Sequence, residues 1–177
     1  MNLSLNTRVC VTVSLALLSL LGVVLCAVAT YSFRFAQAQA VAQQETNMRV
    51  AWQVLRSRGD QFHVADEKLH VNGQPLNGDF GVVDRVKDLV GGVATIFMGD
   101  TRVTTNVIKA DGQRAIGTKL AKGPAYDAVF VRKQGFRGEA DILGLPYFVA
   151  YDPILAKDGS VLGILFVGVR KADYYQP

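Results

Sequence analysis

The chain has 177 residues, half of them hydrophobic, and its 19 Lys and Arg against 15 Asp and Glu give a formal net charge of +4. This length suits one domain of about 100–200 residues with a short appendage, and it leaves no room for a second catalytic domain. Because the basic residues are scattered among acidic ones and form no contiguous stripe, nucleic acid is not expected as a partner.

The hydrophobic residues are concentrated near the N-terminus. Residues 9–31 include no charged side chain. At about 1.5 Å per residue this run would form a helix roughly 34 Å long, which is enough to span a bilayer. We interpret residues 1–31 as a cytoplasmic tip and a transmembrane anchor helix, so the membrane is one expected partner.

Two other interpretations of this segment stay open. A cleaved signal peptide would use a small-residue pattern such as residues 27–29, whereas a lipoprotein signal is disfavoured because Leu25 precedes Cys26. Arg8 lies before the apolar run, which places the N-terminal tail in the cytoplasm. The rest of the chain is then expected outside the inner membrane, in the periplasm or beyond. Cys10 and Cys26 both lie in the apolar run, so the outward part has no disulfide.

Residues 32–59 are expected to form an extracytoplasmic helix that continues the anchor. The segment has no proline, no glycine before Gly59, and many Ala, Gln, Arg and Glu residues, which favour helices. Val41, Met48 and Leu55 recur every seven residues, so one stripe can pack on a domain core or on a second copy of the chain. Core packing is the simpler interpretation, and a homodimer is the alternative that we also expect to find.

From residue 60 onward, short apolar runs alternate with turn signals. Asn72 and Gly73 predict a small hairpin, and Asp79 can cap a helix over residues 82–89. Pro124 can open a second short helix that extends to Lys133. The five strands of a sheet are expected at 93–98, 102–109, 136–143, 145–155 and 160–169.

These elements predict an α+β fold. The loops between neighbouring strands are too short for crossovers, so the five-stranded sheet should be antiparallel. Residues 161–169 are apolar on both faces, which favours the centre of the sheet. We therefore expect a long N-terminal helix, continuing the transmembrane helix, packed on this sheet with short covering helices.

Three segments carry a family resemblance: GGVATIFMGDTRVTTNVIKADGQRAIGTKL, GFRGEADILGLPYFVAYDPI and DGSVLGILFVGV. They resemble the single Cache domains found outside the membrane in bacterial methyl-accepting chemotaxis proteins and some sensor kinases, across residues 52–175. The resemblance implies that residues 60–177 form a PAS-like sensor domain whose concave sheet face holds a small ligand, often an organic acid. It also implies a second membrane helix and a cytoplasmic signalling module. The sequence includes neither, so we expect either the sensor fragment of a longer receptor or a stand-alone anchored sensor.

Arg102 is the first candidate for ligand binding. It opens a strand that continues with Thr104, Thr105 and Asn106, so a guanidinium is followed by hydroxyls and an amide. A carboxylate is well bound by that combination, because guanidinium can donate two parallel hydrogen bonds to it. The alternative is a surface arginine at the end of a hairpin, paired with Asp100.

Four more residues complete the candidate site. Alternation places Tyr147 and Tyr151 on one face of their strand, with Phe97 as a floor and Lys119 in a loop that contacts ligand in relatives. Cross-strand or core packing for the aromatic residues and a plain surface role for Lys119 are the alternatives. Related citrate and dicarboxylate sensor kinases have a second arginine where this chain has Val149. We therefore expect a ligand with one or two carboxylates.

Neither catalysis nor a cofactor is expected. His63 and His70 are the only histidines, and we expect them at opposite ends of a hairpin, so no metal site is predicted. The sequence also has no nucleophile elbow or phosphate loop. The favoured function is extracytoplasmic sensing of a small organic acid in a chemoreceptor or another transmembrane signalling protein. The alternative is a membrane-anchored interaction or dimerisation module without a small-molecule ligand.

Overall fold

The structure is a computed structural model that describes residues 5–174. The predictions for residues 1–4 and 175–177, which include the N-terminal tip and the last residues of the family resemblance, lie outside the described residues. The chain divides into two compact units, one up to Gln39 and one from Ala40 onward.

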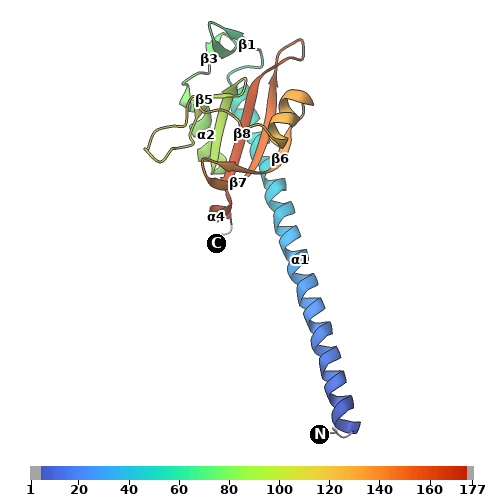
Figure 1. Cartoon of the computed structure of the whole chain (residues 1–177). Helices are drawn as coiled ribbons and strands as arrows, with labels where there is room; N and C mark the ends of the chain where they lie inside the picture. Colours follow the sequence, from blue (N-terminus) through green and yellow to red (C-terminus); the bar gives the residue numbers. More distant parts are fainter. Residues whose placement is uncertain (1–4, 175–177) are drawn as a thin grey trace. The chain divides into compact units, whose positions relative to one another are not determined.

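The first unit is helical throughout its described part. It belongs to α1 (Leu5–Arg56), which Figure 1 shows as an uninterrupted helix from blue to cyan. The side chains of residues 9–35 are exposed and mostly apolar, and α1 is long and apolar enough to cross a membrane. The hydroxyls of Thr12, Ser19 and Thr30 each donate to a carbonyl three residues earlier. These polar groups are therefore satisfied within the helix, as a hydrocarbon environment requires.

The second unit is built on a five-stranded antiparallel sheet, as predicted. The spatial order is β5-β4-β8-β7-β6. The central position of β8 confirms the expectation drawn from its two apolar faces. The strands are β4 (Val93–Met98), β5 (Thr101–Thr105), β6 (Phe136–Ile142), β7 (Leu145–Leu155) and β8 (Val161–Arg170).

One face of the sheet packs against the C-terminal part of α1 and against α2 (Phe80–Val90). Met48 and Leu55 of α1 are completely buried there, together with Val83 of α2. At Met48 and Leu55 the predicted stripe therefore packs on the core of its own domain, whereas Val41 is only partly buried. These two side chains are not free to contact a second copy.

The opposite face has its own hydrophobic core. It includes Phe97, Tyr151 and Phe166, and it is covered in part by α3 (Pro124–Tyr126) and the π-helical turn η1 (Asp127–Val131). The helix predicted after Gly123 is thus present but ends two residues early. Because both faces of the sheet are covered, its central strand β8 is apolar on both sides.

Short helices begin where their capping residues predict. The Asp79 carboxylate accepts a hydrogen bond from the Gly81 amide at 3.0 Å, and Gly91 with φ of 72° ends α2. Leu89, the last residue of the predicted helix, is 49% exposed, because α2 contacts the sheet mainly through its first two turns. A last helix, α4 (Lys171–Tyr174), follows the final strand.

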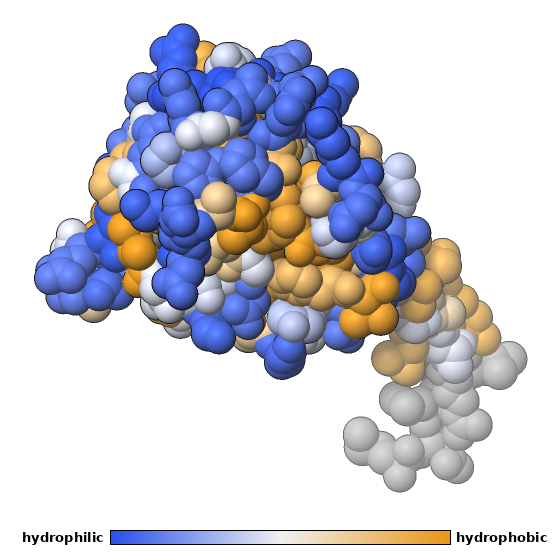
Figure 2. Space-filling view, turned by 90° about the horizontal axis from the view of Figure 1, so that it is seen from above, coloured by the Kyte–Doolittle hydropathy of each residue, from blue (hydrophilic) through white to orange (hydrophobic). Residues whose placement is uncertain are grey.

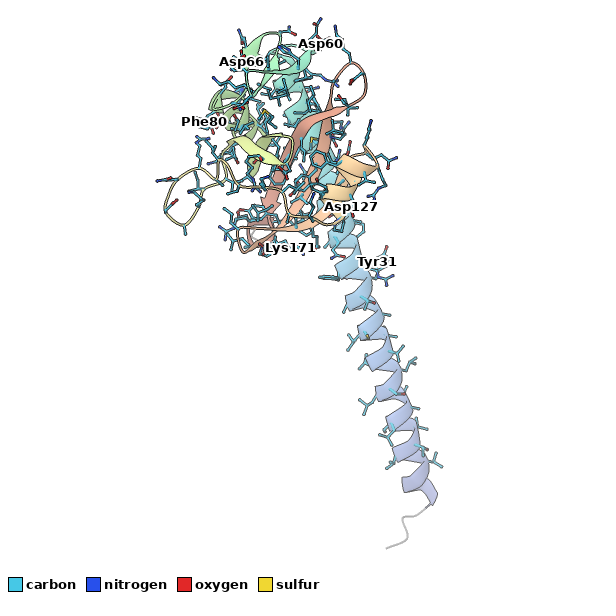
Figure 3. The ribbon with its side chains drawn as sticks, turned by 45° about the horizontal axis from the view of Figure 1, so that its top comes forward. Tyr31, Asp60, Asp66, Phe80, Asp127 and Lys171 are labelled. Carbon is cyan, nitrogen blue, oxygen red and sulfur yellow. The ribbon has the colours of Figure 1, made fainter. Side chains whose placement is uncertain are left out.

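A separate three-stranded sheet contains β1 (Phe62–Ala65), β2 (Lys68–Val71) and β3 (Gln74–Pro75). The turn at Asn72 and Gly73 joins β2 to β3, as predicted. This small sheet and α4 lie at opposite ends of the second unit, as the labels of Asp66 and Lys171 show (Figure 3). Seen from above, a mainly hydrophilic surface surrounds a central area of hydrophobic residues (Figure 2).

The placement of the two histidines corrects the sequence prediction. His63 and His70 are direct cross-strand partners, and their rings stack with centroids 5.1 Å apart. The turn between them uses Asp66 and Glu67 in the left-handed region, which no glycine in the sequence indicated. Within residues 5–174, no group of three His, Cys, Asp or Glu side chains could hold a metal ion.

A glycine in the central strand is a sensitive test of this fold. A methyl group on Gly163 would lie 1.9 Å from the carbonyl oxygen of Phe97, so Gly163→Ala forces the β4 and β8 backbones apart. We expect a loss of about 3 kcal/mol in the free energy of unfolding, measured by urea denaturation of the full chain in detergent. Gly138→Ala is the control, because its methyl group would meet only the movable Phe136 ring. Equal losses in both variants would contradict the described register.

Candidate functional site

A cavity of about 430 Å³ lies beside the second face of the sheet. Its volume is in the range of about 300–1,000 Å³ that is usual for small-molecule sites. The walls come from the end of the β4–β5 hairpin, the loop before α3, and β6 and β7. The main lining residues are Arg102, Thr118, Lys119, Leu120, Lys122, Pro124, Ala125, Phe136, Glu139, Ala140, Asp141, Ile142, Leu143 and Tyr151.

Arg102 contributes a buried positive charge to this cavity. The residue is only 5% exposed, and its Cζ atom lies 5.1 Å from the centre of the Phe97 ring. One terminal nitrogen, Nη1, donates to the Thr118 hydroxyl at 2.6 Å, whereas Nε is buried without a partner. Burial lowers the pKa of Arg102, and only the neighbouring Tyr151 acts in the opposite direction.

No ion pair of the described residues neutralises this guanidinium. The alternative of a surface arginine paired with Asp100 is therefore wrong. Asp100 lies instead 3.6 Å from the ammonium group of Lys119. A desolvated charge without a counter-ion is costly in the free protein, and an anion in the cavity would relieve that cost.

Tyr151 brings a phenol to the same cavity from β7. The side chain is completely buried, and its hydroxyl has no hydrogen-bond partner. Burial raises the pKa of Tyr151 to about 12, although the charge of Arg102 opposes this rise. The phenol therefore stays protonated at neutral pH and can donate a hydrogen bond.

The loop between β5 and α3 supplies the other polar groups. Its segment around Lys119 adds to the edge of the sheet, because the Arg102 amide donates to the Thr118 carbonyl at 2.9 Å. Lys119 itself is largely exposed at the mouth of the cavity. Lys122 also lines the cavity, and its ammonium group lies 3.3 Å from the centre of the Tyr126 ring. The lining thus also includes two lysines, together with the carboxylates of Glu139 and Asp141, which bond to Lys171 and to the Gly144 amide.

Three other predicted residues lie outside the cavity lining. The Thr104 hydroxyl bonds to the carbonyl of Leu76, and the Thr105 hydroxyl lies 2.6 Å from that of Thr95. Asn106 bonds through its side chain to backbone groups of β4 and α2 at 2.7 and 2.9 Å. All three are buried and hold elements together, so we do not include them in the proposed site.

The remaining predicted residues support the site from below or beside it. Phe97 is completely buried under the Arg102 guanidinium and does not line the cavity. Tyr147 is 5% exposed, and burial raises its pKa, but it lies outside the lining as well. Val149, buried between the two tyrosines on the same face of β7, adds no polar group.

The single Cache domain 3 family model matches residues 74–177, which is more than half of the chain. The chain belongs to the single Cache domain family. Members are sensing modules without catalytic activity, which confirms the prediction that this chain is not an enzyme.

Among solved structures, this Cache domain is similar to the crystal structure of the E. coli DcuS sensor domain. The TM-score is 0.45 with 11% sequence identity, and the match covers 80% of this chain and 92% of that chain. Comparison with curated protein sequences finds no match.

Sequence reasoning missed several lining residues of this Cache domain. Thr118 is next to the predicted Lys119, and its partnership with Arg102 requires a loop that returns to the edge of β5. Phe136 pairs across the strands with Tyr151, which a register prediction for the β6–β7 hairpin would have revealed. The apolar side chains of the loop, such as Leu120, carried no signal because loop conformation is not periodic.

Removing the charge of Arg102 should not weaken the ligand-free Cache domain. Arg102→Met replaces a desolvated cation that has no carboxylate partner, so we expect the free energy of unfolding to stay within about 0.5 kcal/mol or to rise. Arg114→Met is the control, because Arg114 holds both carboxylate oxygens of Asp84 at 2.9 Å. That variant should lose about 1–3 kcal/mol in urea denaturation. A larger loss for Arg102→Met than for Arg114→Met would contradict the described environment.

The buried phenol predicts a specific loss of stability in alkali. The unfolded chain ionises Tyr151 near pH 10.0, whereas the folded protein keeps it protonated until about pH 12. The stability contribution is complete below the lower value and is lost as the pH rises through the higher one. From about pH 9 to about pH 11, wild type should therefore lose about 1–1.5 kcal/mol more than Tyr151→Phe in urea denaturation. Parallel pH profiles would contradict the burial of this hydroxyl.

Proposed function

We propose that this Cache domain binds a small organic acid in the cavity beside Arg102 and Tyr151. One observation carries the proposal, namely that a buried guanidinium and a buried phenol, each with an unpartnered polar atom, line the same cavity. Both groups are hydrogen-bond donors, and neither has a carboxylate partner among the described residues. Their common acceptor is an anion.

A carboxylate fits these donors. It can accept hydrogen bonds from the Arg102 guanidinium and from the Tyr151 hydroxyl at once, and each bond to a charged group contributes about 1.5–3 kcal/mol. Lys119 and Lys122 add positive charge to the lining, which the carboxylates of Glu139 and Asp141 on β6 partly offset.

The other walls limit what the carboxylate can be attached to. Phe136, Ile142, Leu143 and Pro124 are apolar, so the body of the ligand is small and largely uncharged. Val149 adds no second buried cation on this face of β7. We therefore assign a ligand with one carboxylate, or with two of which the second reaches the lysines.

The proposal includes an extracytoplasmic position for the sensor. The apolar part of α1 supplies the anchor, and residues 32–59 and 60–177 lie outside the inner membrane, in the periplasm or beyond. In this arrangement the chain transmits a conformational signal to a cytoplasmic module of a chemoreceptor or another signalling protein. Association into a homodimer stays a prediction.

The alternative of an interaction module without ligand receives less support. It requires a filled core next to Tyr151 or a solvated Arg102. The cavity is open, and Arg102 is almost completely buried. In addition, Met48 and Leu55 of the supposed seam are packed on the domain itself.

A panel of organic acids tests the proposed function. We expect at least one of acetate, propionate, pyruvate, lactate, malate and citrate to raise the unfolding temperature of the full chain in detergent, and calorimetry to give its affinity. Arg102→Ala should weaken that affinity by roughly 10–100-fold, the equivalent of one charged hydrogen bond.

The exposed Arg85 of α2 offers a matched control. Arg85→Ala removes the same type of side chain away from the cavity and should leave the affinity unchanged. An acid that binds Arg102→Ala as tightly as wild type would refute the site. Failure of every acid to bind would refute the ligand class.

A further inference from the structure

Arg137 joins α1 to the two strands that wall the cavity. Its Nε donates to the carboxylate of Glu45 on α1 at 2.7 Å. Its Nη1 donates to the carboxylate of Asp152 at 2.7 Å and to the carbonyl oxygens of Phe136 and Tyr151 at 3.0 and 3.2 Å. Phe136 and Tyr151 both line the cavity. One guanidinium therefore contacts the helix and the backbone of two lining residues.

Asp152 makes a second connection to α1. Its other carboxylate oxygen accepts a hydrogen bond from the Trp52 indole nitrogen at 2.8 Å. Glu45 and Trp52 are seven residues apart, which is about two turns of helix. We call Glu45, Trp52, Arg137 and Asp152 the helix clamp.

The clamp and the cavity lie on opposite faces of the same strand pair. Successive side chains of a strand point to opposite faces, so Tyr151 points to the cavity and Asp152 to α1. In β6, the Phe136 side chain points to the cavity and the Arg137 side chain points to α1. Phe136 lies opposite Tyr151 in the strand pairing. Any displacement of the backbone at Phe136 or Tyr151 therefore also moves the next residue of that strand, which belongs to the clamp.

Charge strengthens the clamp. Burial on its own would lower the pKa of Arg137, but the hydrogen bonds and charges of Asp152 and Glu45 outweigh it and raise the pKa. Arg137 is thus neutralised by two carboxylates, whereas Arg102 on the cavity side has none. The ion pairs are only partly buried, so they can rearrange without complete desolvation.

The contact between α1 and the sheet also includes an unsatisfied group. Gln44, next to Glu45, is completely buried, and neither atom of its amide has a hydrogen-bond partner. A buried amide without partners destabilises the arrangement that contains it. A shift of α1 that gives this amide a partner would recover part of that cost.

We propose that the helix clamp transmits the state of the cavity to α1. The identity of the signal rests on the proposed function. The hydrogen-bonded link between the strands and α1 is a property of the fold. An acid held by Arg102 and Tyr151 displaces β7, the carboxylate of Asp152 moves with it, and α1 shifts between two arrangements. Glu45 and Trp52 are positioning residues, since they touch the strands and not the ligand.

The test measures the position of α1 in the full chain. Cys10 and Cys26 are replaced by alanine, and spin labels are attached to Arg49→Cys on the outside of α1 and Lys157→Cys in the β7–β8 turn. Pulsed dipolar spectroscopy in nanodiscs then gives the distance between the labels with and without pyruvate or malate. Thermal shift on the same samples records whether the acid binds.

We expect the acid that binds to change this distance in wild type. In Glu45→Gln and Trp52→Phe the acid should still bind, with an affinity altered several-fold because coupling is reciprocal, but most of the distance change should be lost. Glu67→Gln, an exposed carboxylate in the small sheet, is the control and should behave as wild type. Glu45 is half exposed, so its exchange keeps the fold even if Trp52→Phe does not.

A second arm of the distance measurement needs no ligand. Leu120→Trp places an indole in the cavity from its loop, and it should reproduce the distance change in wild type and not in Glu45→Gln. If no acid of the panel binds while Leu120→Trp acts through the clamp, the proposed function fails and the clamp stands. A distance change that is equal with and without an intact clamp, or absent in both arms, overturns the inference.

Discussion

The guanidinium of Arg102 is removed from water without a carboxylate to balance it, and the site depends on that imbalance. Phe97 lies beneath the charge, and Thr118 satisfies only one of its nitrogens. The fold tolerates this because most of its stability comes from the two apolar cores on either side of the sheet. In the proposed function, an anion bound beside Arg102 would recover part of the cost of the uncompensated charge.

The two faces of β7 carry the residues proposed for two different roles. Tyr151 faces the cavity with an unpartnered hydroxyl, and Asp152, the next residue, faces α1 with both oxygens bonded. Because side chains alternate along a strand, the residues proposed for recognition and for transmission are one position apart and share one backbone. Arg137 and Arg102 illustrate the same division, since the first is neutralised by two carboxylates and the second by none among the described residues.

Family membership and local chemistry support different parts of the conclusion. The family model establishes a sensing module over residues 74–177, but it does not identify what is sensed. The ligand class is argued from Arg102, Tyr151 and the apolar walls around them. Thr104 and Asn106 show why a chemical motif in one strand is not sufficient, because their polar groups serve buried backbone atoms elsewhere in the domain.

The sequence by itself determined the α+β class, the central position of β8, the capped start of α2 and the burial of the stripe that includes Met48. These features follow from local signals, namely apolar periodicity and residues with special backbone preferences. It also indicated Arg102 as a candidate, because a guanidinium followed by hydroxyls and an amide in one strand suits a carboxylate. Only the tertiary structure decided that Thr118 and Tyr151 meet Arg102, since loop closure and strand register bring together residues that are distant in the chain. The same long-range packing, absent from any local pattern, placed Arg137 between the cavity walls and α1.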